Sequence, residues 1–468
     1  MERSSLRVTT GAIVVAAALV AAAPASADRD RHHGPFTPGA PGLGDLFFPL
    51  AGNGGYDVRH YDIEIDYERA TNHMDSRAKI HAKATQNLSS FNLDLRGFDI
   101  PELEVDDRDA TFTRDGQELT VVPRKGIRKG EKFEVEIEYT GTPTEVIDPD
   151  GSSEGWVPTA DGAFVVNEPQ GSPGWYPAND NPQDKATFDF EVTVPEGITV
   201  IGNGRLKDKD TRRGKTTWEW SEDSPMAPYL ATVTNGVFEL RISKHRGLPL
   251  YHAVDPTLDT TVGFQRLAAE PEIIDFFSDL YGRYPFSTGG GVIDRGGVGY
   301  ALESQTKSMY DGVPGPGTVV HEISHQWFGN AVTNAVWPDI WLNEGFARFS
   351  EWIYTERHGG QTAQQAFDTA FAVPATSSFW RTPPAAIPNP AVMFSSPPYT
   401  RGGMTLQALR VKIGDRAFFD VLRTWYRDNR YGNVTTADFI ELAERKARMQ
   451  LDAFFDVWLF QPVKPTVW

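Results

Sequence analysis

Hydrophobic and polar residues alternate along the first half of the chain. From Tyr61 to Tyr67 every second residue is apolar and the residues between them are acidic, which is the pattern of a strand with one buried face. Similar runs begin near residues 133, 188 and 218, and glycine and proline turns separate them. We therefore predict an N-terminal all-β domain of antiparallel sheets, sandwich-like in form, over residues 54–240.

The spacing of apolar residues lengthens from about residue 261. Apolar positions from Phe264 to Leu280 recur at helical intervals, and Gly282 and Pro285 indicate the end of that helix. Further helices are predicted over residues 319–328, 340–357, 401–413, 417–427 and 436–445. Residues 241–468 are thus expected to form a second, mainly helical domain, and the whole chain is predicted to have a multidomain α+β fold.

The first 27 residues have the features of a signal peptide. Arg3 and Arg7 precede an apolar run over residues 11–23, and the small residues 25–27 fit a cleavage site. This predicts bacterial export to the outside of the cell, with a mature chain that begins at Asp28. A transmembrane anchor is the alternative, but the run is short and rich in alanine. No later stretch approaches membrane length, so no membrane span is expected in the mature chain.

Composition narrows the possible partners. Residues 28–53 are rich in Pro and Gly and are predicted to form a flexible linker. The net charge of −18 argues against a nucleic-acid partner, because phosphate binding requires clustered Lys and Arg. The chain contains no cysteine, which excludes disulfides and thiolate metal ligands. None of these features indicates the oligomeric state.

The segment His321-Glu322-Ile323-Ser324-His325 matches the pattern H-E-x-x-H. Residues four apart lie on one face of a helix, so both imidazoles can reach one metal ion and Glu322 lies beside the metal-bound water. Thr318 is a plausible N-cap of this helix and Gly329 a plausible end. A core helix with two hydrogen-bonded histidines is the alternative.

Glu344 is the candidate for a third ligand. It follows His325 after eighteen intervening residues and lies in the first turns of a second predicted helix, among apolar residues. A carboxylate is costly to bury there without a partner, and a zinc ion would supply one. A salt bridge with Arg348, one turn further on, is the alternative.

These residues resemble the gluzincin zinc aminopeptidases, the family of aminopeptidase N and the bifunctional leukotriene hydrolase/aminopeptidase. The eighteen-residue gap is that family's spacing. Weaker matches occur in the family's order, over roughly residues 55–465: Asn167-Glu168-Pro169, Trp175-Tyr176-Pro177, Asn181-Pro182 with residues 185–188, Tyr300-Ala301-Leu302-Glu303-Ser304, and Pro398-Tyr399-Thr400-Arg401-Gly402. The resemblance implies a saddle-shaped β domain followed by a thermolysin-like zinc-peptidase domain.

The resemblance also implies roles for individual residues. One Zn²⁺ per chain would be held by His321, His325 and Glu344, and Glu322 would act as general base. Tyr399 would donate its hydroxyl to the oxyanion of the tetrahedral intermediate. The pair Glu303 and Glu168 would bind the α-ammonium of peptide substrates with a free N-terminus, which would make the enzyme an aminopeptidase. For Tyr399, Glu303 and Glu168, ordinary surface or salt-bridge roles are the alternatives.

Two departures from the family pattern bear on specificity. Tyr300, Leu302 and Ser304 replace the Gly, Met and Asn of the family's exopeptidase motif, which would reshape the first specificity pocket. The chain also ends at Trp468, without room for the large helical domain that roofs the active site in many relatives. An open cleft is therefore expected.

Several alternatives remain at this stage. Trp156, Trp175 and Tyr176 could line the cleft, but aromatic residues belong more often to a core. Glu351 could orient a metal ligand or be a solvated acid. A zinc endopeptidase would keep the metal site without needing Glu303 and Glu168. An epoxide hydrolase of the leukotriene-hydrolase kind and a non-catalytic binding protein on the same scaffold are the remaining readings.

Overall fold

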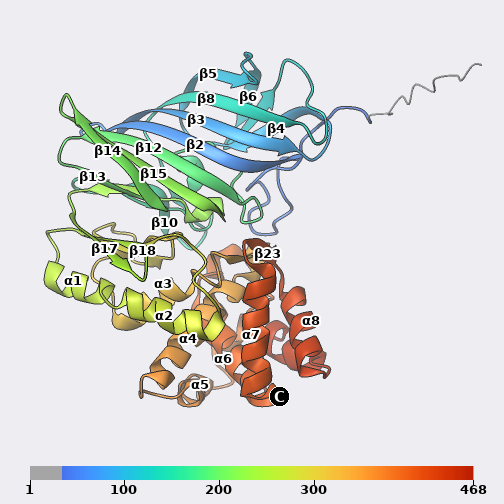
Figure 1. Cartoon of the computed structure of the whole chain (residues 1–468). Coiled ribbons are helices and arrows are strands. Elements are labelled where there is room, and N and C mark those ends of the chain that lie inside the picture. Colours follow the sequence, from blue (N-terminus) through green and yellow to red (C-terminus); the bar gives the residue numbers. More distant parts are fainter. Residues whose placement is uncertain (1–33, 467–468) are drawn as a thin grey trace, which may run out of the picture. The chain divides into compact units, whose positions relative to one another are not determined.

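The computed structural model describes residues 34–466, and the predicted signal peptide lies outside that range. A compact unit begins at Phe36. Within it, β-sheets precede a mainly helical half, in the order that the sequence predicts (Figure 1). None of the helices in the described part is both long and apolar enough to cross a membrane.

The largest sheet has seven strands and dominates the N-terminal half. Its order is β14 (Arg205–Arg212), β15 (Lys215–Met226), β12 (Ala186–Pro195), β2 (Tyr56–Glu68), β3 (His73–Ala84), β8 (Lys132–Gly141) and β5 (Asp99–Val105). All neighbours run antiparallel except β2 and β12, which are parallel. The expectation of purely antiparallel sheets is thus wrong at this one pair of the sheet, because a long connection separates the two strands and no hairpin fixes their direction.

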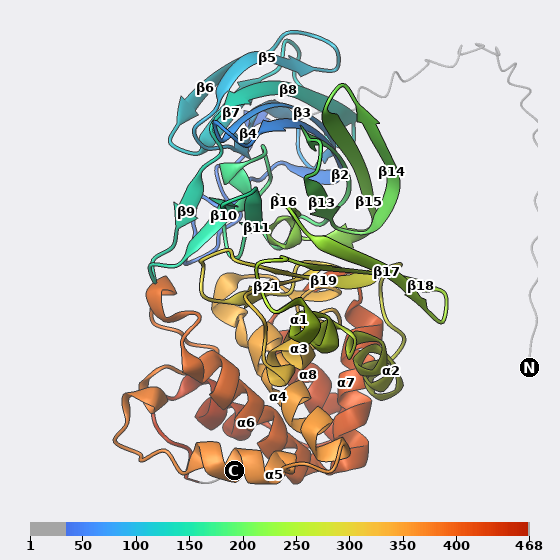
Figure 2. The ribbon, with the colours of Figure 1, turned by 90° about the vertical axis from the view of Figure 1, so that its left-hand side faces the viewer.

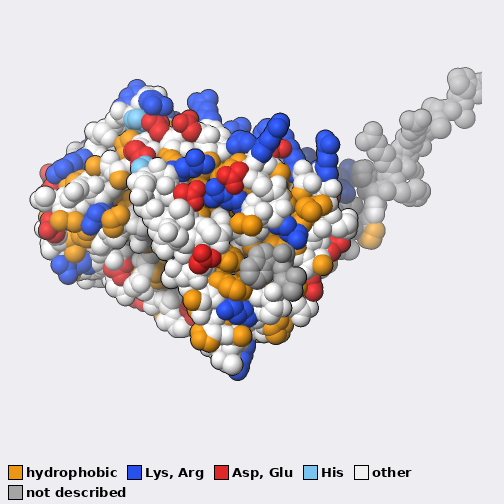
Figure 3. Space-filling model, turned by 90° about the horizontal axis from the view of Figure 1, so that it is seen from below, with side chains coloured by type: hydrophobic (Ala, Val, Ile, Leu, Met, Phe, Trp, Pro, Cys, Tyr) orange, Lys and Arg blue, Asp and Glu red, His pale blue; other side chains and the backbone are white. Residues whose placement is uncertain are grey.

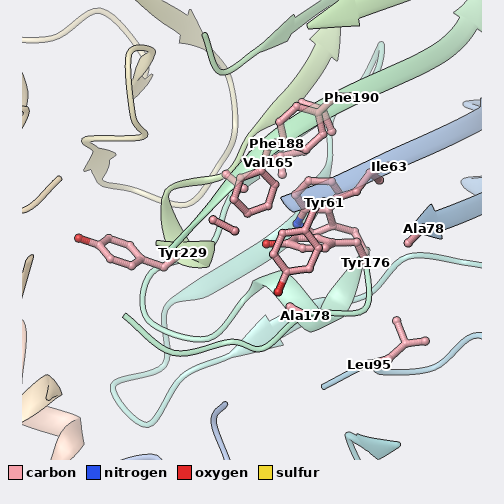
Figure 4. Close-up of a cluster of buried hydrophobic side chains, with 14 of the residues drawn as sticks. Tyr61, Ile63, Ala78, Leu95, Val165, Tyr176, Ala178, Phe188, Phe190 and Tyr229 are labelled. Carbon is pink, nitrogen blue, oxygen red and sulfur yellow. The ribbon is translucent and has the colours of Figure 1, made fainter. Parts of the chain in front are cut away.

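Two smaller sheets complete the β domain. One has the order β1 (Thr37–Pro38), β4 (Leu88–Asp94), β7 (Glu118–Val122) and β6 (Thr111–Asp115), and the other β13 (Thr199–Gly202), β16 (Val233–Gly236), β11 (Ala163–Val166), β10 (Ser153–Pro158) and β9 (Glu145–Ile147). Aromatic side chains fill the core beneath the large sheet (Figure 4). The rings of Tyr61 and Phe188 stack at 4.7 Å, and Tyr176 meets Tyr61 edge-on at 5.7 Å. Trp156, Trp175 and Tyr176 belong to this core and do not line the cavity that holds the candidate metal site.

Residues 36–53 correct the prediction of a flexible linker. Strand β1 pairs with β4, and the buried Asp45 carboxylate accepts a hydrogen bond from the backbone N–H of Trp337 at 2.7 Å. Phe48 packs edge-on against the Trp337 ring, with centroids 6.4 Å apart. The Pro and Gly residues form turns here, whereas the apolar side chains between them supply the burial that holds the segment in place.

A five-stranded sheet begins the second half. It consists of β17 (Glu239–His245), β18 (Leu248–Val254), β19 (Gly289–Asp294), β21 (Ser308–Asp311) and β20 (Ala301–Leu302). Helices lie on the side of this sheet away from the β domain (Figures 1 and 2). We propose the domain boundary at about residue 240, as the sequence predicts, because β17 is the first strand to join this sheet.

The helices follow the predicted positions with local differences. They are α1 (Thr260–Leu267), α2 (Glu270–Tyr281), α3 (Pro316–Ser324), α4 (Trp341–Arg357), α5 (Ala363–Phe371), α6 (Ser396–Ile413), α7 (Asp415–Asn429), α8 (Thr436–Ala447) and α9 (Asp452–Phe455), and β22 (Val332–Asn334) pairs with β23 (Gly432–Val434). The single helix expected before Gly282 is two helices, because Pro271 starts a new one. On the face seen in Figure 3, acidic, basic and hydrophobic side chains are interspersed.

Two glycines bring α4 and α6 into backbone contact. A Cβ added at Gly345 would lie 2.9 Å from Cα of Gly402, and a Cβ at Gly402 would lie 2.8 Å from Cα of Gly345. These distances are shorter than side-chain carbons tolerate, so both positions require glycine at this spacing. Gly345 follows the predicted ligand Glu344, and Gly402 lies one turn after Tyr399. The contact thereby fixes these two side chains relative to each other.

Candidate metal centre and active-site cleft

Helix α3 carries the H-E-x-x-H motif. It begins at Pro316 with Gly315 as the N-cap, three residues before the predicted start, because proline fits the first turn of a helix. Thr318 is therefore not the N-cap. The helix ends at Ser324, but His325 keeps helical backbone angles and its N–H donates to the carbonyl of His321 at 3.2 Å. The two imidazoles consequently still share one face of the helix.

The three predicted ligands converge. Nε2 of His321 lies 3.0 Å from Oε2 of Glu344, and Nε2 of His325 lies 3.4 Å from the same oxygen. One ligand atom from each residue lies within 4.8 Å of the others, and all three side chains are buried. The ion pair considered for Glu344 and Arg348 is replaced by one between Arg348 and Glu351, at 2.9 Å.

Both imidazoles are held by their other nitrogen. Nδ1 of His321 lies 2.7 Å from Oε1 of Glu351, and Nδ1 of His325 lies 3.0 Å from the carbonyl of Phe328. Because these partners accept hydrogen bonds, each Nδ1 carries a proton, and each Nε2 is directed toward Glu344, where it can bind a metal ion in place of its own proton. This is the arrangement in which histidines bind a metal ion. Two imidazole nitrogens and one carboxylate also form a normal donor set for zinc, so the residues fit that ion.

The charges at the site favour a cation. Burial lowers the pKa of His325, but the carboxylates of Glu303 and Glu344 outweigh it and raise this pKa to about 9. Burial raises the pKa of Glu344, but the positive charges on His325 and His321 outweigh it and hold the pKa at about 2. Positive charge between the ligands therefore stabilises the site. A divalent ion would supply that charge with both imidazole rings neutral.

Glu351 is expected to strengthen zinc binding through His321. Replacing it by glutamine removes the charged acceptor at Nδ1, and loss of such a partner typically costs about 10–100-fold in metal affinity. Competition with a chelator measures this change. Glu356→Gln serves as the control, because that residue lies on the same helix but pairs with Arg410. Equal zinc affinity of Glu351→Gln and the wild type would contradict the role.

Glu322 lies next to the predicted metal position. It is 4% exposed, and one of its oxygens lies within 4.8 Å of ligand atoms of His325 and Glu303. Burial raises its pKa to about 8, although the neighbouring His321 and His325 act against this. The charge of a bound metal ion would act against this increase and lower the pKa of Glu322. A lower pKa favours the ionised carboxylate that a general base requires.

Glu303 and Glu168 place two further carboxylates in the same cavity, which has a volume of about 640 Å³. Glu303 is 2% exposed, and Oε1 of each residue is buried without a hydrogen-bond partner. Burial, and for Glu168 the charge of Glu303, raise the pKa of both groups. Buried acceptors without partners are costly in a folded protein, so a donor from a bound molecule is expected here.

Tyr399 completes the cavity from the side of α6. The sequence suggests a proline-rich loop, but Pro397 and Pro398 occupy the first turn of α6, so Tyr399 lies on a helix. Its ring is nearly parallel to that of His321, with centroids 5.9 Å apart. Burial and four nearby carboxylates raise its pKa well above the usual value, which keeps the hydroxyl protonated and able to donate.

Sequence reasoning missed part of the wall. Ser152, from the turn before β10, and Phe394, from the segment before α6, also line the cavity. Neither lies in a recognisable motif, so no sequence signal identified them. Tyr300 lines the cavity as well, and its hydroxyl donates to the backbone carbonyl of Ser153 at 2.9 Å. The residue that departs from the family's exopeptidase motif thus braces the wall formed by the β domain.

Comparison with known protein families shows the family to which the chain belongs. The family model of the peptidase M1 N-terminal domain matches residues 58–230, and that of the peptidase family M1 domain matches residues 301–458. The chain belongs to peptidase family M1. This confirms the predicted resemblance to the aminopeptidase N family. The predicted fold class, a β-rich domain followed by a mainly helical peptidase domain, is confirmed as well.

Relatives within family M1 differ in length from this chain. Glutamyl aminopeptidase of Rattus norvegicus is 25% identical over 335 residues, which are 65% of this chain and 35% of that protein. Aminopeptidase N of Lactococcus lactis is 25% identical over 334 residues, 62% of this chain and 38% of that protein. The chain thus spans little more than a third of these M1 proteins.

A solved M1 structure matches nearly end to end. The M1 zinc metallopeptidase of Deinococcus radiodurans superimposes with a TM-score of 0.84 at 27% identity, covering 91% of this chain and 98% of that one. A variant of this enzyme has been solved with the substrate Tyr-Ser-Ala, and a variant of a two-domain M1 zinc metallopeptidase has been solved with L-arginine. The two-domain arrangement therefore occurs in an M1 enzyme of known structure.

Proposed function

We propose that this protein is a zinc-dependent aminopeptidase, exported from a bacterial cell, that removes N-terminal residues from peptides. The observation that carries the proposal is the shared cavity, in which the three-residue metal site lies beside Glu168 and Glu303, each with one carboxylate oxygen that has no hydrogen-bond partner. The peptide bound to the Deinococcus enzyme and the amino acid bound to a two-domain M1 zinc metallopeptidase have the free amino group that such carboxylates would bind. Export rests on residues 1–27 alone.

The reaction would use residues of both domains. A zinc ion held by His321, His325 and Glu344 would lower the pKa of a bound water and polarise the scissile carbonyl. Glu322 would accept the proton of that water and deliver it to the leaving amine. Tyr399 would donate its hydroxyl to the oxyanion of the tetrahedral intermediate.

Glu303 and Glu168 would determine which peptide bond is cleaved, namely the first bond after the N-terminal residue. An α-ammonium between them would satisfy both unpartnered oxygens and compensate two buried negative charges. The scissile bond one residue further on would then face Glu322 and the metal site. A single N-terminal residue would be removed in each turnover.

Blocking the substrate's amino group tests this selection of the first bond. We expect N-acetyl-Tyr-Ser-Ala to be cleaved with a kcat/KM lower by about 10²–10⁴-fold than that of Tyr-Ser-Ala, since two hydrogen bonds to charged groups, each about 1.5–3 kcal/mol, are lost. Cleavage rates of the two peptides, measured by chromatography, check this expectation.

Substitutions separate the selection of the first bond from general peptide binding. Glu168→Gln should reduce the difference in kcat/KM between the free and the blocked peptide. Glu145→Gln, at an exposed position of β9, should leave this difference unchanged. Equal cleavage of the two peptides by the wild type would refute the aminopeptidase and favour the zinc endopeptidase with an open cleft.

A further inference from the structure

A second group of metal-ligating side chains lies on the large sheet, away from the cleft. His60 and Asp62 of β2 and Asp189 of β12 bring one ligand atom each within 4.8 Å of one another. His81 of β3 lies directly opposite His60 in the ladder and borders this group of three. Asp189 is likewise the ladder partner of Asp62.

The sheet geometry places these side chains on one face. Side chains alternate between the two faces of a strand, so His60 and Asp62 point away from the face that buries Tyr61 and Ile63. They are partly exposed, with 26% of the His60 side chain and 39% of the Asp62 side chain accessible. An ion in solution can therefore reach the cluster.

A threonine fixes the proton on His60. The Thr187 hydroxyl donates to the carbonyl of Arg59 at 3.2 Å, so its oxygen accepts from Nδ1–H of His60 at 2.7 Å. Nε2 then lies 3.0 Å from Oδ1 of Asp62 and 3.7 Å from Oδ2 of Asp189. Two carboxylates thus face one imidazole nitrogen, and positive charge among these atoms compensates them, either as a proton on Nε2 or as a bound metal ion.

His81 repeats this arrangement from the other side. Its Nδ1 lies 3.3 Å from Oε2 of Glu134, and its Nε2 lies 3.0 Å from Oδ2 of Asp62. Both imidazoles thus have an acceptor at Nδ1 and turn Nε2 toward a shared carboxylate, as His321 and His325 do in the cleft. The separations at His60 are close to the roughly 3.3–3.6 Å between ligands of a tetrahedral ion with bonds of about 2.0–2.2 Å.

We propose that His60, Asp62 and Asp189 form a second zinc site on the outer face of the large sheet. Imidazole and carboxylate ligands suit Zn²⁺ among the divalent ions. The ion would join β2 and β12, which pair in the sheet although residues 69–185 separate them along the chain. Because it would bind the folded sheet and not the unfolded chain, it would stabilise the β domain. The inference does not depend on the proposed aminopeptidase activity.

Zinc stoichiometry of the whole protein tests this site. After removal of metal with a chelator, the protein is titrated with Zn²⁺ at mildly alkaline pH, because the hydrogen bond with Asp62 raises the pKa of His60 and protons compete at lower pH. We expect two zinc ions per wild-type chain and one in His60→Gln/His81→Gln. A variant of the cleft, His325→Gln, should retain the sheet zinc, and its melting temperature should still rise on zinc addition.

His73→Gln is the matched control. His73 is an exposed histidine of β3 that bonds to Thr140 and Asp75 outside the cluster, so this variant should bind two zinc ions. Should the double variant fail to fold, the exposed Asp189→Asn replaces it, with an expected loss of at least about tenfold in affinity for one zinc, as for weakened metal shells elsewhere. Equal zinc content and affinity in the wild type and the cluster variants would overturn the proposal and leave a proton as the cation.

Discussion

Replacing Glu322 by glutamine is expected to reduce kcat about 10²–10⁴-fold while zinc binding and folding are retained. The amide has the size of the carboxylate but accepts no proton at neutral pH, so the step from water to leaving amine loses its base. Glu322 is no metal ligand in the proposed site, and the ligands His321 and His325 keep their hydrogen bonds to Glu351 and Phe328. Steady-state hydrolysis of Tyr-Ser-Ala, with zinc content measured on the same sample, checks the prediction.

Measuring kcat and zinc content on the same sample separates loss of the general base from loss of the metal. Glu441→Gln alters an exposed glutamate of α8 that pairs with Arg445, and it should leave kcat unchanged. A Glu322→Gln protein with one zinc in the cleft and a near-normal rate would remove Glu322 from the mechanism. A protein without zinc in the cleft would show that Glu322 serves metal binding instead.

Replacing Tyr399 by phenylalanine is expected to lower kcat by about 10²–10³-fold with little change in KM. A hydroxyl that bonds the oxyanion acts in the transition state and not on the bound peptide, and removal of one such donor typically costs this much. The raised pKa of Tyr399 also implies that its deprotonation does not set the alkaline limit of activity. Initial rates over a range of peptide concentrations and pH provide both measurements.

Tyr300 offers a matched control in the same cavity. Its hydroxyl already donates to the carbonyl of Ser153, so Tyr300→Phe removes a phenolic oxygen from the wall without removing a donor from the reaction. Its kcat should fall far less than that of Tyr399→Phe. A Tyr399→Phe variant with raised KM and normal kcat would mean that the tyrosine only binds substrate.

Periodicity and turn residues predict most of this fold, because the two halves differ in how apolar positions repeat. The long strand β2 and helices α4 and α7 follow directly from their patterns. Helix α5 escaped prediction although Thr362 and Gln365 form a capping box, a sequence signal for a helix start. The direction of β12 along β2 depends on packing of distant segments, and no local pattern encodes it.

Motif spacing and the family resemblance predict which residues meet at the candidate site, but they do not predict the hydrogen bonds that hold these residues. All seven predicted residues line one cavity, although their roles stay predictions. Long-range partners such as Glu168 and Glu303 required the family resemblance, since nothing in their local sequence indicates that they meet. Hydrogen bonds to backbone, such as that from His325 to the carbonyl of Phe328, follow from the way the chain turns after α3. Side-chain patterns carry no information about them.

The glycine contact between α4 and α6 limits how the cleft can open. Where main chains touch, neither helix can roll about its long axis without a collision or a gap. Glu344 on α4 and Tyr399 on α6 therefore move together as one rigid unit. Widening that admits a bulky peptide is therefore left to the rest of the cavity wall, which includes Ser152 and Glu168 of the β domain and Tyr300 and Phe394 of the second half. The size of substrate that the cleft accepts is thus set by these segments and not by the spacing of α4 and α6.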